Sequence, residues 1–395
     1  ILGFTKLIKY SLRNEAIFLK GEVKLKDIKL SEYQNTSIYF YLFDVVIKNQ
    51  NLNKNEFLIS IGISPTSYRR ARKSEQAIGH EIIKILADYF NYRLLTNEEI
   101  SNMEILFTNI YNDMYYKCFD NYDSYMNTLD HEIATNSILF PILYDFKAFM
   151  MFNKILKPEE EKKAFDIYKE NKCYENFFNF QLKNIFKIYD IFFLDDFQEY
   201  YSINDFDDGL KFYIISSIYV KKNDVIKFFY YADIAKNYFL KNNNFMRILY
   251  LNNTYMNVYS KINDFKSCYN LAKSQYLSLK GIGKKTEFND DTLAYLTVSC
   301  IAMKRYSEII SLLEDKIKLP RTIVYCKLVA LYMLKEKEYE ESMTELFSKV
   351  EKKESETLKA LDLYLKKQDD KSLKIIENAG LKMNFSGALK MIFKQ

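Results

Sequence analysis

The side chains best suited to chemistry in this sequence stand in one short basic run, from Ser64 to Lys73. A guanidinium group can hold a guanine edge through two hydrogen bonds, and hydroxyl groups can reach bases or phosphates. If the run is a helix, Tyr68 and Ala71 lie three positions apart and face inward. Most polar side chains then fall on the outer face, which predicts contact with nucleic acid. The predicted contacts are Lys54, Ser64, Thr66, Ser67, Arg69, Arg70, Arg72 and Lys73.

Signals just before the basic run predict a helix, a turn and a second helix. Asn53 is a good N-cap for a short first helix. Gly62 supplies the turn, because a residue without Cβ takes positive φ at no steric cost. Ser64 can then cap the helix that carries the basic run, with Pro65 at its first position, where the missing N–H does no harm.

Apolar residues on either side of this pair of helices predict a small core that holds them. An earlier helix carries Leu42, Val45 and Val46 on one stripe. A later helix carries Ile78, Ile82, Ile85, Leu86 and Phe90 at helical spacing. Together the signals predict four short helices around the basic run.

The segment from Leu42 to Asn91 resembles the Cro/repressor-type (XRE) helix-turn-helix domain. Residues 51–58 stand where that family has G-L-S-Q-x-x-L-A, residues 62–64 match G-[VI]-S, and residues 85–91 resemble I-L-A-x-x-L-G. The family's Gln at the start of the second helix is Lys54 here, which favours contact with phosphate at this position. The alternative is a basic helical hairpin whose arginines are only solvated.

The charge and composition agree with such a segment. Residues 1–95 carry 15 Lys and Arg against 9 Asp and Glu, whereas the other 300 carry 42 against 43. A positive segment is what binding to phosphates requires.

The chain holds only 9 Gly and 4 Pro, which favours long helices joined by short loops. No run of about 18 apolar residues occurs, so we expect no membrane span.

No arrangement of residues is suited to catalysis or to a metal. The five cysteines are scattered without CxxC spacing, which fits a reducing cytoplasm and neither a disulfide framework nor a zinc site. His80 and His131 stand in different regions without a metal-binding pattern. Residues 281–286 lack the first Gly and the Ser/Thr of a phosphate loop. We therefore expect no enzyme, no cofactor and no metal.

The second half of the chain repeats. Five equivalent positions begin the second helix of a hairpin at spacings of 40, 41, 33 and 33 residues: Val225, Phe265, Tyr306, Tyr339 and Ser372. Short polar loops such as residues 221–224 and 261–264 precede them. The pattern resembles tetratricopeptide (TPR) repeats, whose period is about 34, without the consensus Trp, Gly and Pro. The alternative is a non-repeating helical bundle.

Stacked hairpins leave a concave surface lined by the first helix of each pair. On one such helix Asn253, Asn257 and Lys261 are each four residues apart and form a polar ridge. Asparagine amides can pair with a peptide backbone, and lysine can receive a carboxylate. The alternative is a solvated helix face. The TPR resemblance implies a peptide-binding set of Tyr213, Ser217, Tyr250, Asn253, Asn257, Lys261 and Lys327.

An XRE-like domain followed by TPR-like repeats resembles the RRNPPA family of peptide-pheromone receptors, of the Rgg and PlcR type. The resemblance implies an all-α, cytoplasmic transcriptional regulator that acts in quorum sensing. It implies a homodimer that binds a double-stranded DNA operator and a short signalling peptide. Self-association is expected in the C-terminal repeats, because amphipathic helices such as Leu358 to Leu365 end the array and need a cover.

The predicted organisation has three parts. Residues 1–35 are an N-terminal extension without assignment, in which residues 23–26 form a short strand or extend the next domain. Residues 36–95 form the XRE-like helix-turn-helix domain, and residues 96–395 form the TPR-like solenoid for ligand binding and dimerisation. Two alternatives remain open. One is a regulator whose repeats bind another protein, and the other is a TPR-like protein–protein adaptor without DNA binding.

Overall fold

The computed structural model describes residues 27–73, 76–154, 158–194, 209–282, 288–314, 319–350, 352–381 and 383–393. Within these ranges every named element is a helix, and the single β-type pairing is an isolated bridge between Arg93 and Ser137. The predicted all-α class is confirmed. None of the helices in these ranges is both long and apolar enough to cross a membrane. The predicted strand or extension at residues 23–26 lies outside the described residues.

The chain divides into two compact units. The N-terminal unit comprises the described residues within Val23–Ile218 and Tyr230–Met246. The C-terminal unit comprises those within Tyr219–Phe229 and Arg247–Gln395. The domain boundary expected between residues 95 and 96 therefore lies inside the N-terminal unit.

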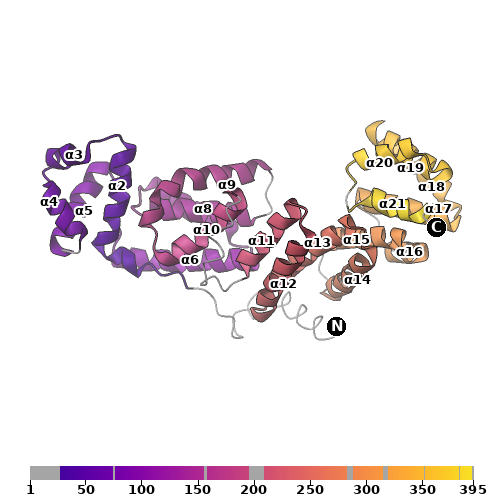
Figure 1. Cartoon of the computed structure of the whole chain (residues 1–395), viewed down its shortest axis with the longest axis horizontal. Helices are drawn as coiled ribbons and strands as arrows, with labels where there is room; N and C mark the ends of the chain where they lie inside the picture. Colours follow the sequence, from indigo (N-terminus) through magenta and orange to yellow (C-terminus); the bar gives the residue numbers. More distant parts are fainter. Residues whose placement is uncertain are drawn as a thin grey trace. The chain divides into compact units, whose positions relative to one another are not determined.

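Helices of two sets make up the N-terminal unit (Figure 1). The first set is η1 (Ser31–Gln34), η2 (Thr36–Ile38), α2 (Tyr39–Asn49), α3 (Lys54–Ser60), α4 (Pro65–Arg72) and α5 (Gln76–Phe90). The second is α6 (Asn97–Tyr116), α7 (Tyr122–Ala134), α8 (Phe140–Asn153), α9 (Pro158–Asn171), η3 (Lys172–Phe177) and α10 (Phe180–Leu194). Two helices, α11 (Leu210–Lys221) and α12 (Val225–Lys241), follow and are shared between the two units.

The core of α2–α5 forms largely as predicted. Tyr68 and Ala71 on α4 are buried, as the spacing of the basic run indicated. On α5 the prediction is wrong for Ile78 and Ile85, which are 37% and 40% exposed. A helix that packs on one side buries only a stripe about 100° wide. Ile78 and Ile85 are two turns apart and lie beside that stripe, so they stay partly exposed. The helix partly buries Phe90 and fully buries Ile82, Ile83, Leu86 and Ala87.

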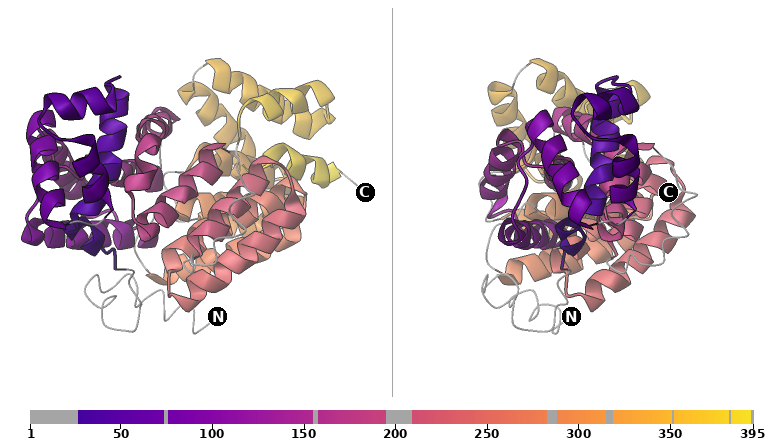
Figure 2. Two further views of the ribbon diagram at one scale, coloured as in Figure 1. Left: turned by 60° about the vertical axis from the view of Figure 1, so that its left-hand side comes forward. Right: turned by 90° about the vertical axis from the view of Figure 1, so that its left-hand side faces the viewer.

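The α2–α5 cluster lies against the helices that follow it (Figures 1 and 2). The Tyr33 hydroxyl donates to the Phe177 carbonyl over 2.9 Å and accepts from the backbone N–H of Asn179 over 3.0 Å. The ring of Tyr92, which follows α5, stacks on that of Phe140 with centroids 5.2 Å apart. These contacts attach the residues just before and just after the cluster to α8 and to the segment around η3, which explains why it shares their compact unit.

The C-terminal unit is an array of short helices. They are α13 (Phe245–Lys261), α14 (Phe265–Ile282), α15 (Phe288–Ala302), α16 (Tyr306–Leu313), α17 (Arg321–Leu334), α18 (Glu338–Lys349), α19 (Lys352–Lys367), α20 (Asp370–Asn378) and α21 (Phe385–Phe393). Helix α14 packs on α15, α16 packs on α17, and α15 packs on both α17 and α21. Because α15 has neighbours on all these sides, every residue from 292 to 301 is buried.

Three of the five helix starts predicted from the repeated pattern are confirmed, and the other two helices begin one or two residues earlier than predicted. Val225, Phe265 and Tyr306 are the first residues of α12, α14 and α16. Tyr339 is the second residue of α18, and Ser372 is the third residue of α20.

The first two predicted loops repeat each other in atomic detail. Asn223 and Asn263 both take left-handed backbone conformations, with φ of 56° and 60°. The next residue, Asp224 or Asp264, accepts a hydrogen bond from the backbone N–H three residues on, over 3.1 Å and 3.0 Å. Seven of the twelve described non-glycine residues with positive φ are asparagines. Asparagine tolerates this conformation better than most residues, which allows a chain with so few glycines to end its helices.

Candidate functional site

The turn that leads into α4 has the predicted geometry. Gly62 takes a φ of 81°. The Asn53 side chain caps α3 by accepting from the Asn55 N–H over 3.2 Å. The Ser64 hydroxyl caps α4 by accepting from the Ser67 N–H over 3.0 Å, and Pro65 stands at the first position of the helix. Both N-caps are therefore confirmed.

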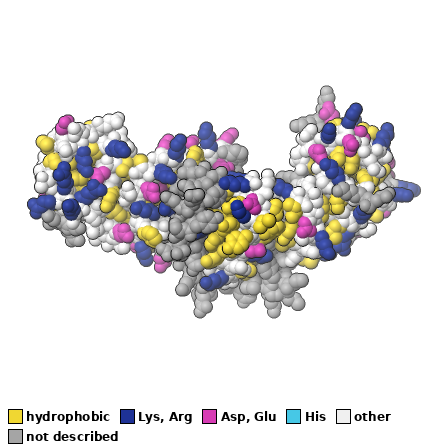
Figure 3. Space-filling model, in the orientation of Figure 1, with side chains coloured by type: hydrophobic (Ala, Val, Ile, Leu, Met, Phe, Trp, Pro, Cys, Tyr) yellow, Lys and Arg dark blue, Asp and Glu magenta, His cyan; other side chains and the backbone are white. Residues whose placement is uncertain are grey.

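The outer face of α4 and the residue after it carry most of the predicted DNA contacts. The exceptions are Lys54 on α3 and Ser64, the N-cap of α4. The hydroxyl oxygens of Ser64 and Ser67 pair with each other over 2.9 Å. Figure 3 shows Lys and Arg side chains gathered where Figure 1 labels α3, α4 and α5. Among the predicted contacts, the exposed residues are Ser64, Thr66, Arg69, Arg70, Arg72 and Lys73.

Asp44 on α2 organises this face, although its role was not predicted from the sequence. Its carboxylate accepts a hydrogen bond of 2.8 Å from the Tyr68 hydroxyl. It also pairs with the Lys54 ammonium and, over 3.0 Å, with the Arg72 guanidinium. One signal was present, since Asp44 is the single acidic residue of α2 and stands between the apolar residues Phe43 and Val45.

Two of the predicted DNA contacts are therefore engaged inside the α2–α5 cluster. The Lys54 ammonium lies 4.4 Å from the centre of the Tyr68 ring. The Arg72 guanidinium lies 4.9 Å from the centre of the Tyr41 ring. Burial and the neighbouring Asp44 raise the pKa of Tyr68, so its hydroxyl keeps the proton that it donates. Lys54 and Arg72 thus hold α3 and α4 against α2.

The predicted peptide-binding set is divided between the two compact units. Tyr213 and Ser217 lie on α11 in the N-terminal unit, where the Ser217 hydroxyl donates to the Tyr213 carbonyl over 3.0 Å. The remaining five residues lie in the C-terminal unit. Among them, Lys327 on α17 pairs with Glu338 over 3.0 Å.

The polar ridge on α13 is the part of this set that lies together on one helix. Asn253 and Asn257 are partly exposed and Lys261 is exposed. Next to them, the Tyr250 ring packs edge-on against Phe288 with centroids 4.8 Å apart. Among the described residues, Asn257 and Lys261 have no hydrogen-bond or ion-pair partner. These two side chains are available to a ligand.

Gln275 on α14 supports this ridge and was missed in the sequence analysis. Its Nε2 donates to the Asn253 Oδ1 over 3.0 Å. One signal was present in the sequence: Gln275 is a polar residue on the same helical face as the apolar residues Ala272 and Leu279. Both of these are buried in the structure.

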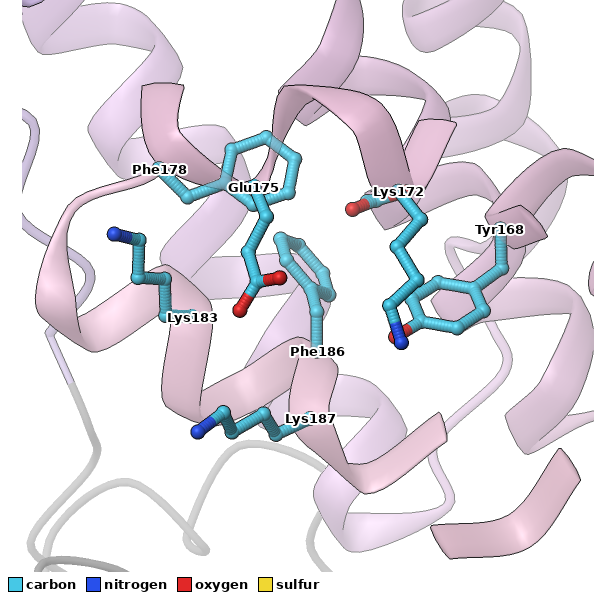
Figure 4. Close-up of a pocket in the computed structure, with 8 residues that line it drawn as sticks. Tyr168, Lys172, Glu175, Phe178, Lys183, Phe186 and Lys187 are labelled. Atoms are coloured by element: carbon cyan, nitrogen blue, oxygen red, sulfur yellow. The ribbon is translucent and has the colours of Figure 1, made fainter. Parts of the chain in front are cut away.

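A separate small pocket lies in the N-terminal unit (Figure 4). Its wall combines ammonium groups, carboxylates and aromatic rings, from Asp145, Tyr168, Lys172, Glu175, Phe178, Lys183, Phe186 and Lys187. In the view of Figure 4, Glu175 lies between Lys183 and Phe186. Asp145 accepts a hydrogen bond of 2.8 Å from Asn171 and belongs to the packing of α8 and α9. The lining carries three lysines and two acidic residues, and this mixture of charges favours no ligand class.

In the described part of the chain, no group of three or more His, Cys, Asp and Glu side chains could hold a metal ion. Comparisons of the chain with protein-family models, with curated proteins and with solved structures gave no match.

Proposed function

We propose that the chain is a cytoplasmic transcriptional regulator that binds duplex DNA through α4 and senses a short signalling peptide through TPR-like repeats, as in quorum sensing. The observation that carries the proposal is the outer face of α4. Thr66, Arg69 and Arg70 are exposed there, on a helix with a capped N-terminus and a buried inner face. This is the arrangement of a recognition helix in a helix-turn-helix.

We assign two roles to the basic residues of α3 and α4. Arg69 and Arg70 point from the exposed face and suit bidentate contact with guanine. Lys54 and Arg72 pair with Asp44 and set the orientation of the helix, with their exposed parts left for phosphate. A single small domain buries little DNA surface, so we propose a homodimer on a two-fold operator.

The proposal of TPR-like repeats rests on the helix order and on the packing. Equivalent helices begin within two residues of the predicted positions, and α15 packs on α17, its equivalent in the next pair. Contact between first helices of successive pairs is typical of TPR arrays. The ridge on α13 then offers Asn257 and Lys261 to an extended peptide.

The DNA-binding proposal is tested with duplexes selected by the wild-type chain from a random library. Arg69→Ala and Arg70→Ala are each expected to lose about 1–3 kcal/mol of specific binding, measured by fluorescence anisotropy. The matched control is Lys84→Ala, which removes an exposed positive charge from α5. A folded double variant of Arg69 and Arg70 with unchanged affinity would overturn the assignment of α4.

Salt titration separates a regulator from an adaptor. A regulator is expected to bind duplex DNA with an affinity that falls steeply as salt rises, because bound phosphates release counterions. If the folded chain shows no salt-dependent binding to any selected duplex, the TPR-like adaptor is the better assignment.

The peptide proposal is tested with a positional-scanning library of fluorescently labelled heptapeptides. We expect Asn257→Ala to weaken the best binders about tenfold, because a desolvated peptide group loses its partner. Asn237→Ala, which changes an exposed amide on α12, is the matched control. If Asn257→Ala binds the peptides as tightly as the wild type and as Asn237→Ala, the ridge is only a solvated surface.

A further inference from the structure

A buried amide links three helices behind the ridge on α13. Gln275 on α14 is only 3% exposed. Its Nε2 donates to Asn253 Oδ1 on α13 over 3.0 Å and to Thr292 Oγ1 on α15 over 2.8 Å. Burying an amide costs free energy unless its polar atoms find partners, so these two hydrogen bonds restrain the position of Gln275.

The direction of the Gln275 amide follows from its surroundings. As placed, both N–H donors have acceptors, and Oε1 is the one atom of the group without a partner among the described residues. The reversed amide would turn Oε1 towards Asn253 and Thr292 and would leave two buried N–H donors unpaired. Unpaired buried N–H groups are rarer than unpaired buried carbonyl oxygens, which favours the observed direction.

This direction determines what Asn253 offers to a ligand. Its Oδ1 receives the Gln275 hydrogen bond, whereas its Nδ2 has no partner in the described parts of the chain. The residue is partly exposed on the ridge. An amide held in this way presents N–H donors, and N–H donors bind carbonyl oxygens.

We propose that Gln275 is a positioning residue that orients the Asn253 amide, so that this point of the ridge binds a backbone carbonyl oxygen of an extended peptide. The inference rests on the proposed peptide-binding function and adds the polarity of one contact to it. Thr292 assists by accepting the second hydrogen bond of Gln275. Asn253 touches the ligand, and Gln275 acts through Asn253.

The first test changes the polarity of Asn253 and keeps its size. A carboxylate still accepts from Gln275 but offers no N–H donor. With the labelled heptapeptides, we therefore expect Asn253→Asp to bind about tenfold more weakly, like Asn253→Ala. Wild-type affinity in Asn253→Asp would overturn the proposed polarity.

The second test is a double-variant cycle between Gln275 and Asn253. Gln275→Leu is expected to weaken peptide binding in the wild-type background and to have little further effect when Asn253 is Ala, because it acts through that side chain. Ser278→Ala is the control, since Ser278 is equally buried one turn along α14 and bonds only within its own helix. Two outcomes would contradict the positioning role. One is that the losses of peptide affinity from Gln275→Leu and Asn253→Ala are additive, and the other is that Ser278→Ala loses as much affinity as Gln275→Leu.

The third test needs no ligand. In protein labelled with ¹⁵N at Asn and Gln side chains, we expect the Gln275 amide protons to exchange slowly with water and those of Asn253 to exchange fast. Gln275→Leu is expected to shift the Asn253 resonances, and Asn237 serves as an exposed reference. Equal exchange at both amides would overturn the inference. If no heptapeptide binds the wild-type chain, the proposed function fails, and this measurement still decides the orientation of Asn253.

Discussion

The Tyr68 hydroxyl donates a hydrogen bond of 2.8 Å to the Asp44 carboxylate and so joins α4 to α2. The same carboxylate pairs with Lys54 at the start of α3 and with Arg72 at the end of α4. A helix that reads bases must be held at a defined rotation about its axis, because a small rotation changes which side chains face the groove. Asp44 supplies this restraint from the helix that precedes the turn.

Removing this carboxylate is expected to loosen the α2–α5 cluster. Asp44→Ala leaves two cations without their partner and the Tyr68 hydroxyl with only the Phe40 carbonyl, 3.3 Å away, so we expect a loss of about 1–3 kcal/mol in the free energy of unfolding. Tyr68→Phe removes the hydroxyl that donates to Asp44 over 2.8 Å and to the Phe40 carbonyl over 3.3 Å, and it is expected to cost about 0.5–1.5 kcal/mol. Urea unfolding of both single variants and the double variant measures these losses. Because the residues share a hydrogen bond, the double variant is expected to lose less than the sum, and strict additivity would argue against the contact.

The left-handed turn at Asn223 gives a prediction from backbone geometry. At a φ of 56°, a Cβ without a local hydrogen-bonding group is disfavoured by about 1–2 kcal/mol, whereas glycine is free of strain. We therefore expect Asn223→Ala to lower stability and Asn223→Gly to leave it nearly unchanged. Thermal unfolding of the two variants measures the difference. Equal melting temperatures would contradict the assigned conformation.

The cysteines are expected to differ in reactivity because burial disfavours the thiolate. Burial raises the pKa of Cys268 to about 11 and that of Cys300 and Cys326 to about 12, whereas Cys173 is exposed. At pH 8 we expect iodoacetamide to modify Cys173 in the folded protein and the three buried thiols only after unfolding. Mass spectrometry of digested protein identifies the modified residues. Rapid modification of Cys326 without unfolding would contradict its burial.

The same thiols predict a loss of stability at alkaline pH. Their pKa values are raised in the folded state, so the unfolded chain loses protons first. The stabilisation is complete below the unfolded thiol pKa of about 8.5 and falls as pH rises through about 11 to 12. Urea unfolding at a series of pH values measures this decline. Cys173→Ser is the control and is expected to leave the profile unchanged, since that thiol is exposed.

The C-terminal helix α21 is expected to be essential for the C-terminal unit. Leu389 is fully buried, and the helix packs on α15. Leu389→Ala is expected to cost about 2–5 kcal/mol, because it leaves a cavity in this contact. Lys390→Ala is the control, since it removes an exposed ion pair with Glu377 worth about 0–1 kcal/mol. Similar melting temperatures for the two variants would show that α21 does not support the core.

The expectation that the last helices need a cover bears on the proposed dimer. Leu358, Leu361 and Leu365 on α19 are buried within the chain itself. Helix α20 packs on α19, and the Phe393 ring lies 5.7 Å from that of Tyr364. The apolar face that motivated self-association at this end is therefore already covered, and the proposed homodimer rests on the geometry of operator binding.

Local signals in the sequence were sufficient for the all-helical class and for several helix boundaries. The caps at Asn53 and Ser64, the positive φ at Gly62 and the start of α14 at Phe265 all appear as predicted. Each depends on groups within a few residues of one another, such as a side-chain oxygen and an N–H three positions later. The inward position of Tyr68 follows in the same way from helical spacing.

Only the tertiary structure decided which partners these helices meet. The contact of Asp44 with Tyr68, that of Gln275 with Asn253, and the packing of α21 on α15 join residues that lie far apart in the chain. Helical periodicity indicates which face of a helix is apolar. The exact rotation of each helix and its neighbours depend on how the faces of all the helices fit together. For that reason the basic residues of α4 could be named from the sequence, whereas the carboxylate that holds two of the predicted DNA contacts in place could not.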